Sequence, residues 1–273
     1  LILGYNYTLD RRFINDKKFV YFNESEFTGG FSIPINTSKG RNFTFFNIGS
    51  QYTFNQTHIQ RRFKDHFKDF SYSYLNNFLS FSNQTEKAQQ QIFPSFAQTL
   101  LIRYKTPVTN VRGYQLLANG NIYFPGILKT HSLVLNAAFS QKDSLKQINF
   151  SSGFPFSRGY EAVNFSNMIK WGINYHFPIV YPDKGFSDIV YLLRMRLNPF
   201  YDHTYVSDYN TKKQLLKKQF RSVGSELYFD TKWWNQVYIS FGIRYSYLLD
   251  NDLLENKGHN RWELMLPVNI LNK

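Results

Sequence analysis

Apolar and polar residues alternate along most of the C-terminal half of this chain. Residues 237–250 have an apolar or aromatic residue at every odd position and mainly small or charged residues at the even ones. Because successive side chains of a strand point to opposite faces, this run predicts a strand with one apolar and one polar face. The same alternation recurs at 168–179, at 187–203 and at 261–270.

The rest of the chain has the same period, and about twelve strands are expected in all. The earlier strands are predicted at 1–9, 19–35, 42–55, 69–82, 95–106, 114–125 and 131–141. Long loops are predicted at 10–17, 141–164, 204–219 and 250–259, with short turns at 180–186 and 231–236. Successive strands joined in this way favour antiparallel hairpins.

Strand length and aromatic placement favour a transmembrane β-barrel over a soluble β-sandwich. Strands of roughly 10 to 14 residues suit a tilted membrane strand better than the roughly 5 to 6 residues of globular sheets. Tryptophans lie near predicted strand ends, at Trp233, Trp234 and Trp262, where aromatic girdles meet bilayer interfaces. The predicted fold class is therefore all-β, a single transmembrane antiparallel β-barrel domain over residues 1–273.

Composition agrees with this prediction and excludes several function classes. The mean hydropathy of −0.42 is compatible with a membrane barrel, because only alternate residues meet lipid. The chain has no cysteine, so disulfides and thiol chemistry are excluded. Its net charge of +13 raises nucleic acid as a partner, but no nucleic-acid motif accompanies the charge, and none is expected to bind. The histidines are scattered and no catalytic motif is present, so we expect no enzyme, cofactor or metal site.

The loop lengths predict an orientation. Outer-membrane barrels have short periplasmic turns and long outer loops. Placing the C-terminus in the periplasm puts the loops 141–164, 204–219 and 250–259 outside. On this interpretation Arg61, Arg62, Lys64, Lys212, Lys213, Lys217 and Lys218 lie on the outer side. There they are candidates for contact with the phosphates of lipopolysaccharide, although solvated loop charge explains them equally simply.

The loop 141–164 contains Ser157-Arg158-Gly159-Tyr160 and is followed by five predicted strands. This arrangement resembles the BamA/TamA superfamily of outer-membrane assembly and secretion barrels, which carries a (Val/Ile)-Arg-Gly-(Phe/Tyr) motif in a long outer loop. Ser157 departs from that pattern. A closer literal match, Val111-Arg112-Gly113-Tyr114, is followed by seven predicted strands and has a short connection, so Arg158 is preferred.

The resemblance also implies partners for the motif. In the family the loop folds into the lumen and its arginine meets the acid of a Phe-x-Asp segment; here Phe200-Tyr201-Asp202 matches that segment. A second family acid falls at His176. The resemblance implies a 16-stranded barrel, with further strands and periplasmic domains such as POTRA repeats expected upstream.

Function follows only as an expectation from this resemblance. The chain is expected to act in insertion, assembly or translocation of outer-membrane proteins, with unfolded barrel proteins and accessory subunits as partners. Pro267 in the last predicted strand cannot donate a ladder hydrogen bond, which suits a seam that opens or simply a barrel rim. The alternatives are a passive channel or anchor for an upstream domain, such as an enzyme domain, and a soluble carbohydrate-binding β-protein.

Overall fold

A computed structural model describes residues 1–15, 18–61, 64, 68–88, 90–109, 111–143, 153–186, 189–209, 214–234, 236–252 and 258–266. It contains one antiparallel sheet of thirteen strands in which nearly every strand pairs with its neighbours in sequence. The short strand β9 lies off this path and pairs with β10. The strands are β1 (Ile2–Asn15), β2 (Lys18–Asn36), β3 (Asn42–Ile59), β4 (Phe70–Thr85), β5 (Ala97–Pro107), β6 (Gln115–Pro125), β7 (Ser132–Lys142), β8 (Asn167–Val180), β9 (Lys184–Phe186), β10 (Val190–Tyr209), β11 (Leu215–Trp233), β12 (Val237–Leu248) and β13 (Asn260–Met265).

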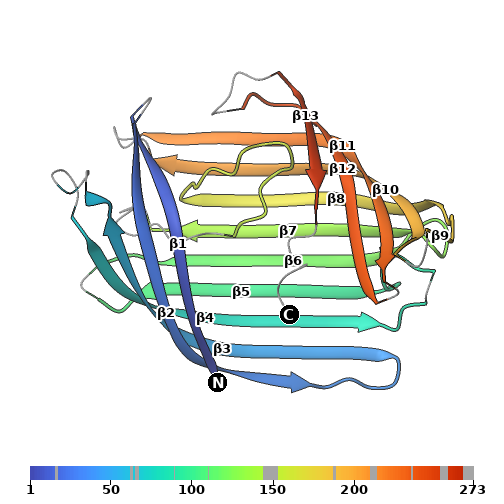
Figure 1. Ribbon diagram of the computed structural model, residues 1–273, viewed down its shortest axis with the longest axis horizontal. Helices are drawn as coiled ribbons and strands as arrows, with labels where there is room; N and C mark the ends of the chain where they lie inside the picture. The colour runs from blue at the N-terminus through green and yellow to red at the C-terminus, as the bar shows by residue number, and fades with distance from the viewer. Residues whose placement is uncertain are drawn as a thin grey trace.

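The sheet curls around a hollow, with β1 and β13 as its two edges (Figure 1). Within the described residues no ladder joins β1 to β13, so the sheet is open along this side. β13 pairs with β12 over only six positions, from Gly242↔Met265 to Tyr247↔Asn260. The all-β antiparallel fold predicted from the sequence is therefore confirmed, in an open and curled form.

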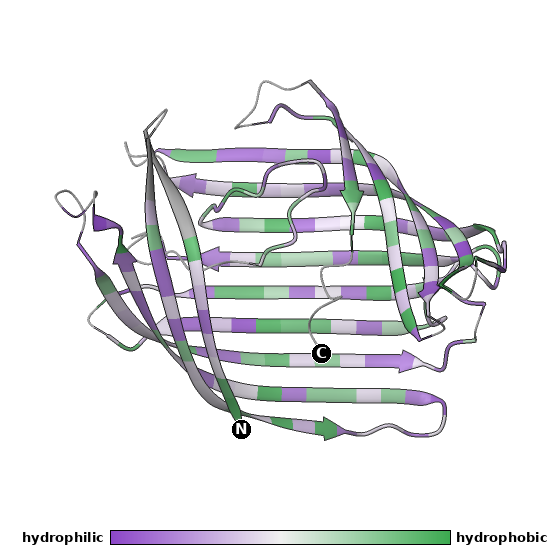
Figure 2. Ribbon diagram, viewed as in Figure 1, coloured by the Kyte–Doolittle hydropathy of each residue, from purple (hydrophilic) through white to green (hydrophobic). Residues whose placement is uncertain are grey.

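The distribution of side chains is the reverse of that in a soluble sheet protein. Hydropathy alternates along the strands (Figure 2), and the apolar residues of this pattern remain exposed on the convex face. They include Leu3, Phe31, Ile48, Trp171, Ile173 and Ile243, each more than 40% exposed. The concave face is polar and buried, with Asn55, Ser140, Asn198, Asp202, Thr204, Ser222 and Glu226 at 2% exposure or less. A sheet with an apolar outer surface and a polar interior is the pattern expected of a transmembrane barrel.

Several predicted loops are in fact strand. β1 continues to Asn15, through most of the loop predicted at 10–17. β10 extends to Tyr209 and β11 begins at Leu215, so the loop predicted at 204–219 was also wrong. Both segments are polar and basic, which made them resemble loops, but the ladder continues through them because each has a partner strand of matching length. The predicted seam residue Pro267 lies outside the described residues.

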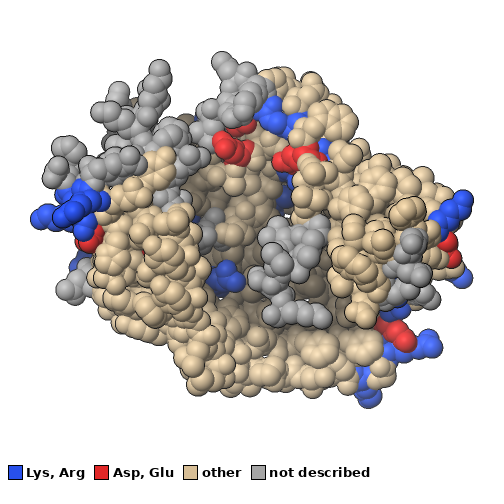
Figure 3. Space-filling view, viewed as in Figure 1, with Lys and Arg blue, Asp and Glu red and all other residues tan. Residues whose placement is uncertain are grey.

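The concave side holds a segment of the β7–β8 connection, residues 153–166, which enters the hollow visible in Figures 1 and 3. Its aromatic residues Phe154, Tyr160 and Phe165 form an apolar cluster with strand residues such as Met168 and Phe220. The ring of Phe220 contacts three loop rings, those of Phe156, Tyr160 and Phe165, at centroid distances between 5.1 and 6.2 Å. The hollow thus has a small hydrophobic core, to which one loop and the surrounding strands both contribute. No described helix has the length and hydrophobicity to cross a membrane.

Candidate functional site: an arginine docked inside the sheet

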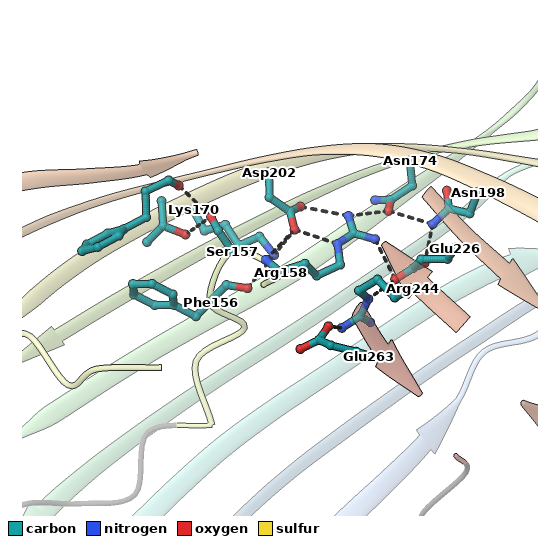
Figure 4. A network of polar contacts seen from close by, with 12 residues as sticks. Phe156, Ser157, Arg158, Lys170, Asn174, Asn198, Asp202, Glu226, Arg244 and Glu263 are labelled. Carbon is teal, nitrogen blue, oxygen red and sulfur yellow. Dashed lines mark hydrogen bonds and ion pairs between the residues drawn. The ribbon is translucent and has the colours of Figure 1, made fainter. Parts of the chain in front are cut away.

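The loop segment 153–166 brings Arg158 against the carboxylate of Asp202 on the inner face of β10 (Figure 4). Nε of Arg158 donates to Asp202 Oδ2 at 2.7 Å, and Nη2 donates to Oδ1 at 3.0 Å. The backbone N–H of Arg158 also donates to Asp202 Oδ2, at 3.1 Å. This parallel pair of bonds uses the planar geometry of the guanidinium, which lysine cannot reproduce.

Three further groups complete the surroundings of the guanidinium. Nη2 of Arg158 donates to the side-chain oxygen of Asn174 at 2.7 Å, and Nη1 lies 3.2 Å from Glu226 Oε1. The guanidinium carbon lies 3.6 Å from the centre of the Phe200 ring, which is a cation–π contact. The Arg158 side chain is only 13% exposed, so these contacts replace most of its water.

Asp202 is wholly buried and forms an ion pair with a second cation, Lys170 on β8. Nζ of Lys170 lies 3.4 Å from Asp202 Oδ2 and donates to the carbonyl of Phe156 at 3.1 Å. Gly172, paired with Asp202 across the ladder, makes room for this carboxylate: a Cβ there would lie 2.5 Å from Asp202 Oδ1. The local sequence of β8 therefore fits the docking of the loop.

Across the last strands, the network continues along a single row of the sheet. Asn198 of β10 pairs in register with Glu226 of β11, which pairs with Arg244 of β12, which pairs with Glu263 of β13. Glu226 accepts from Asn198 at 2.7 Å and from Arg244 at 2.7 Å, and Arg244 reaches Glu263 at 2.8 Å. Directly opposed charges of this kind stabilise a sheet pair.

The whole network is balanced in charge. Its cations are Arg158, Lys170 and Arg244, and its carboxylates are Asp202, Glu226 and Glu263. Buried charges are tolerated when each has an opposite partner and hydrogen bonds, and removal of one partner leaves a costly unpaired charge. The row therefore connects the loop to the edge strand β13.

Two small residues beside Arg158 fix the turn. Gly159 has φ of +84°, and a Cβ there would lie 2.8 Å from Cβ of Ser246 and 2.9 Å from Cδ2 of Leu248. Only glycine fits this position without strain. Ser157 is buried, contacts Thr204 Oγ1 at 2.7 Å and donates to the carbonyl of Phe220 at 2.9 Å. Where the motif that this segment resembles has an aliphatic side chain, Ser157 has a hydroxyl, and this hydroxyl is hydrogen-bonded on both sides.

Tyr160 fastens the loop to the first part of β11 and to the residues that follow β12. Its hydroxyl lies 2.8 Å from the carbonyl of Arg221 and 3.0 Å from that of Asp250, and it accepts from the Asp250 N–H at 3.0 Å. Burial raises the pKa of Tyr160 to about 12, and the hydrogen bond with the Asp250 backbone opposes this rise. The phenol therefore stays protonated at ordinary pH.

Of the residues proposed from the sequence, Arg158, Phe200 and Asp202 are brought together. His176 lies elsewhere: its Nδ1 is 3.3 Å from Arg196, and its ring contacts Phe93. Asn174, two residues earlier on the same face, stands beside Arg158 instead. In the alternative motif, Gly113 has no positive φ and its nearest contact for a Cβ is 4.0 Å away. A residue with a side chain would therefore fit at position 113 without strain.

Sequence reasoning assigned no role to Lys170, Asn174, Asn198, Glu226 and Arg244. Four of them, Lys170, Asn174, Asn198 and Arg244, belong to the polar positions of predicted strands, so the alternation could have nominated them. It could not single them out, because the polar face has many members and only the register between strands decides which of them meet.

The basic residues proposed for lipid contact fall at one end of the sheet where they are described. Arg61 and Lys64 lie between β3 and β4, and Lys64 Nζ lies 3.0 Å from Asp69. Lys217 and Lys218 lie near the start of β11. Arg62, Lys212 and Lys213 lie outside the described residues. No group of three or more His, Asp or Glu suitable for a metal ion occurs in the part of the chain described.

The sheet has an apolar outer face, a polar inner face and a loop docked in its interior. This arrangement is that of barrel folds whose lumen is filled by a loop. No family model matches the chain, and no curated protein matches it. A similar solved structure is the crystal structure of BamA from Haemophilus ducreyi lacking POTRA domains 1–3, with a TM-score of 0.50 and 14% identity. The match covers 96% of this chain and 57% of that chain, so this chain spans a little over half of the protein it resembles. The fold is therefore that of a BamA-like barrel, as the sequence predicted.

Proposed function

We propose that this chain is part of an outer-membrane barrel that acts in the insertion and assembly, or translocation, of proteins at that membrane. The observation that carries the proposal is the docked arginine: Arg158 on Asp202, held by a charge-balanced network that extends to the edge strand β13. Supporting it are the exposed apolar outer face and the resemblance of the fold to a BamA barrel.

Mechanistically, the loop and the sheet edge have separate roles. Residues 153–166 fill part of the lumen with a packed cluster, which favours a route along the wall rather than through the pore. An unpaired strand edge offers N–H and C=O groups to an incoming strand, so β1 or β13 can template a substrate strand by β-augmentation. Glu263 ties β13 to Arg244 and hence to the docked loop.

An engineered disulfide tests which route a substrate takes. Ser157 Oγ and Thr204 Oγ1 are 2.7 Å apart, and the chain has no cysteine, so S157C/T204C would join the loop to β10 without competing thiols. We expect the oxidised protein to keep its assembly activity, because the loop works in its docked position. Loss of activity on oxidation and recovery on reduction would show that the loop must leave the lumen, contradicting the edge mechanism.

Depletion of the full-length protein in its own cells tests whether it is a passive anchor or an assembly factor. An assembly role predicts that other outer-membrane barrels lose their heat-modifiable, folded form. Normal folding of those barrels would overturn the proposal and leave the anchoring function.

We also propose that the C-terminus faces the periplasm and that the basic residues face outward. Arg61, Lys64 and Lys217 are exposed, and all three lie at the end of the sheet from which the loop 153–166 enters. Outer-leaflet lipopolysaccharide carries phosphates that such residues attract. Co-purification of lipid A should fall when Arg61, Lys64, Lys217 and Lys218 are changed to glutamine.

A further inference from the structure

At the opposite end of the sheet from the motif loop, the β4–β5 connection forms one wall of a second site. Residues 86–88 and 90–96 lie beside β6, β8 and β10. Phe93 contacts the rings of Tyr123 and His176 at 5.2 and 4.9 Å, and the carbonyl of Gln90 accepts from Tyr181 at 3.2 Å. Ile92 is 6% exposed, so the segment is packed against the sheet rather than free in solvent.

Between this segment and strands β10, β11 and β12 lies a cavity of about 890 Å³. Its apolar wall includes Ile92, Phe93, Leu193, Tyr238 and Ile239. The remaining lining residues are mostly polar or charged, so the cavity offers both an apolar surface and polar groups to a small molecule. Charged side chains gather at the right-hand end of Figure 3, the end at which Figure 1 places β9.

The charged groups of this cavity have more donors than acceptors. Asp230 is already saturated: it accepts from Arg194 Nε at 2.8 Å, from Arg196 Nε at 3.2 Å and from Ser240 Oγ at 2.6 Å. The other lining acid, Asp183, is exposed. Three lining cations against two lining acids leave one positive charge in excess.

Three cationic donors around the cavity are held only by long hydrogen bonds. Arg194 Nη1 donates to the Gln90 carbonyl at 3.4 Å, Arg196 Nη2 donates to Ser240 at 3.4 Å, and Lys87 Nζ donates to the Ile92 carbonyl at 3.4 Å. Bonds of this length are weak, and a carboxylate makes shorter and stronger bonds to the same donors. An anionic ligand would therefore improve contacts that the chain alone leaves poor.

We propose that this cavity binds a monocarboxylate with an apolar tail, its carboxylate between Lys87, Arg194 and Arg196 and its tail against Ile92 and Phe93. The single excess positive charge selects a monoanion, and the apolar wall selects the tail. The site is separate from the Arg158 network and does not depend on the function proposed above.

Titration calorimetry of the full chain in a non-ionic detergent tests the site with two probes, octanoate and 4-phenylbutanoate, and with octan-1-ol as the neutral analogue. We expect a carboxylate to bind, K87Q to weaken binding roughly 3- to 10-fold, and R194Q to weaken it by more than about 10-fold. The matched control K39Q changes an exposed lysine at the same end of the sheet and should have no effect.

The two probes distinguish the sources of such a ligand. Binding of octanoate alone points to lipid-derived fatty acids, and binding of 4-phenylbutanoate points to aromatic acids. K87Q keeps the test valid if R194Q fails to fold, because Lys87 is an exposed residue outside the strands. Failure of both carboxylates to bind, equal binding of octan-1-ol, or equal weakening by K39Q and K87Q would each overturn the proposal.

Discussion

At the scale of single residues, position within the charge network matters more than charge itself. Asp202 and Glu263 are both carboxylates in one network, yet Asp202 is fully buried between two cations, whereas Glu263 is 42% exposed at the sheet edge. Loss of the first leaves Arg158 and Lys170 without their shared partner in a dry site. Loss of the Glu263 carboxylate costs less, because the Arg244 side chain is already partly exposed to water.

Asp202→Asn should therefore lower the free energy of unfolding by about 3–5 kcal/mol, as expected for one partner removed from a buried ion pair. Glu263→Gln should cost less than about 1 kcal/mol. The urea midpoint of the heat-modifiable gel shift measures both. Equal effects of the two substitutions would mean that the interior is open to water and that the network does not hold the loop.

A glycine pair distinguishes the two Arg-Gly-Tyr sequences. Gly159→Ala forces a side chain into left-handed backbone and to within 3 Å of Ser246 and Leu248, which should cost about 2–4 kcal/mol. Gly113→Ala meets nothing closer than 4.0 Å and should change stability by less than about 0.5 kcal/mol. Thermal unfolding of both variants is the measurement, and a larger effect at Gly113 would transfer the motif's role to the earlier loop.

At the scale of elements, the Tyr160 hydroxyl is one of the groups that hold the loop 153–166 to the ends of β11 and β12. Tyr160→Phe removes that hydroxyl and leaves the Asp250 N–H without its acceptor. We expect the Asp250 amide to exchange with solvent about 10-fold faster, corresponding to the loss of about 1.4 kcal/mol of local stability. Tyr191→Phe, a tyrosine at the far end of β10, is the control and should leave this amide unchanged.

The same hydroxyl gives the loop a dependence on alkaline pH. Because the folded pKa of Tyr160 is raised from 10.0 to about 12, its contribution to stability is complete below pH 10 and is lost as the pH rises through about 12. The wild-type melting temperature should fall across this window more than that of Tyr160→Phe. Parallel curves for the two proteins would show that the phenol is not buried on folding.

At the scale of the whole molecule, the exposed apolar face of the inside-out sheet is the surface expected to contact lipid. Ile173 lies near the middle of β8 and is 41% exposed, whereas Ile127 lies in the β6–β7 turn and is 89% exposed. In lipid vesicles Ile173→Arg should cost about 2–4 kcal/mol, and Ile127→Arg should cost about 0–1 kcal/mol. Small and equal effects on vesicle folding would contradict the membrane assignment, since a soluble sheet tolerates arginine at both exposed positions.

The sequence by itself determined the period-2 alternation, hence the antiparallel strands, their inner and outer faces, and the polar character of the interior. It also marked Arg158 and Asp202, because each lies in a short segment that resembles a motif of the BamA/TamA superfamily. It misjudged the polar ends of β1, β10 and β11, since strand ends depend on the length of the neighbour that hydrogen-bonds to them.

Only the tertiary structure decided which polar residues meet. Asn198, Glu226, Arg244 and Glu263 form one row because four strands share a register, and Asn174 rather than His176 faces Arg158 for the same reason. The cavity beside Arg194 likewise depends on where the β4–β5 connection folds. Alternation is a property of each strand alone, whereas register and loop docking depend on contacts between residues distant in the chain.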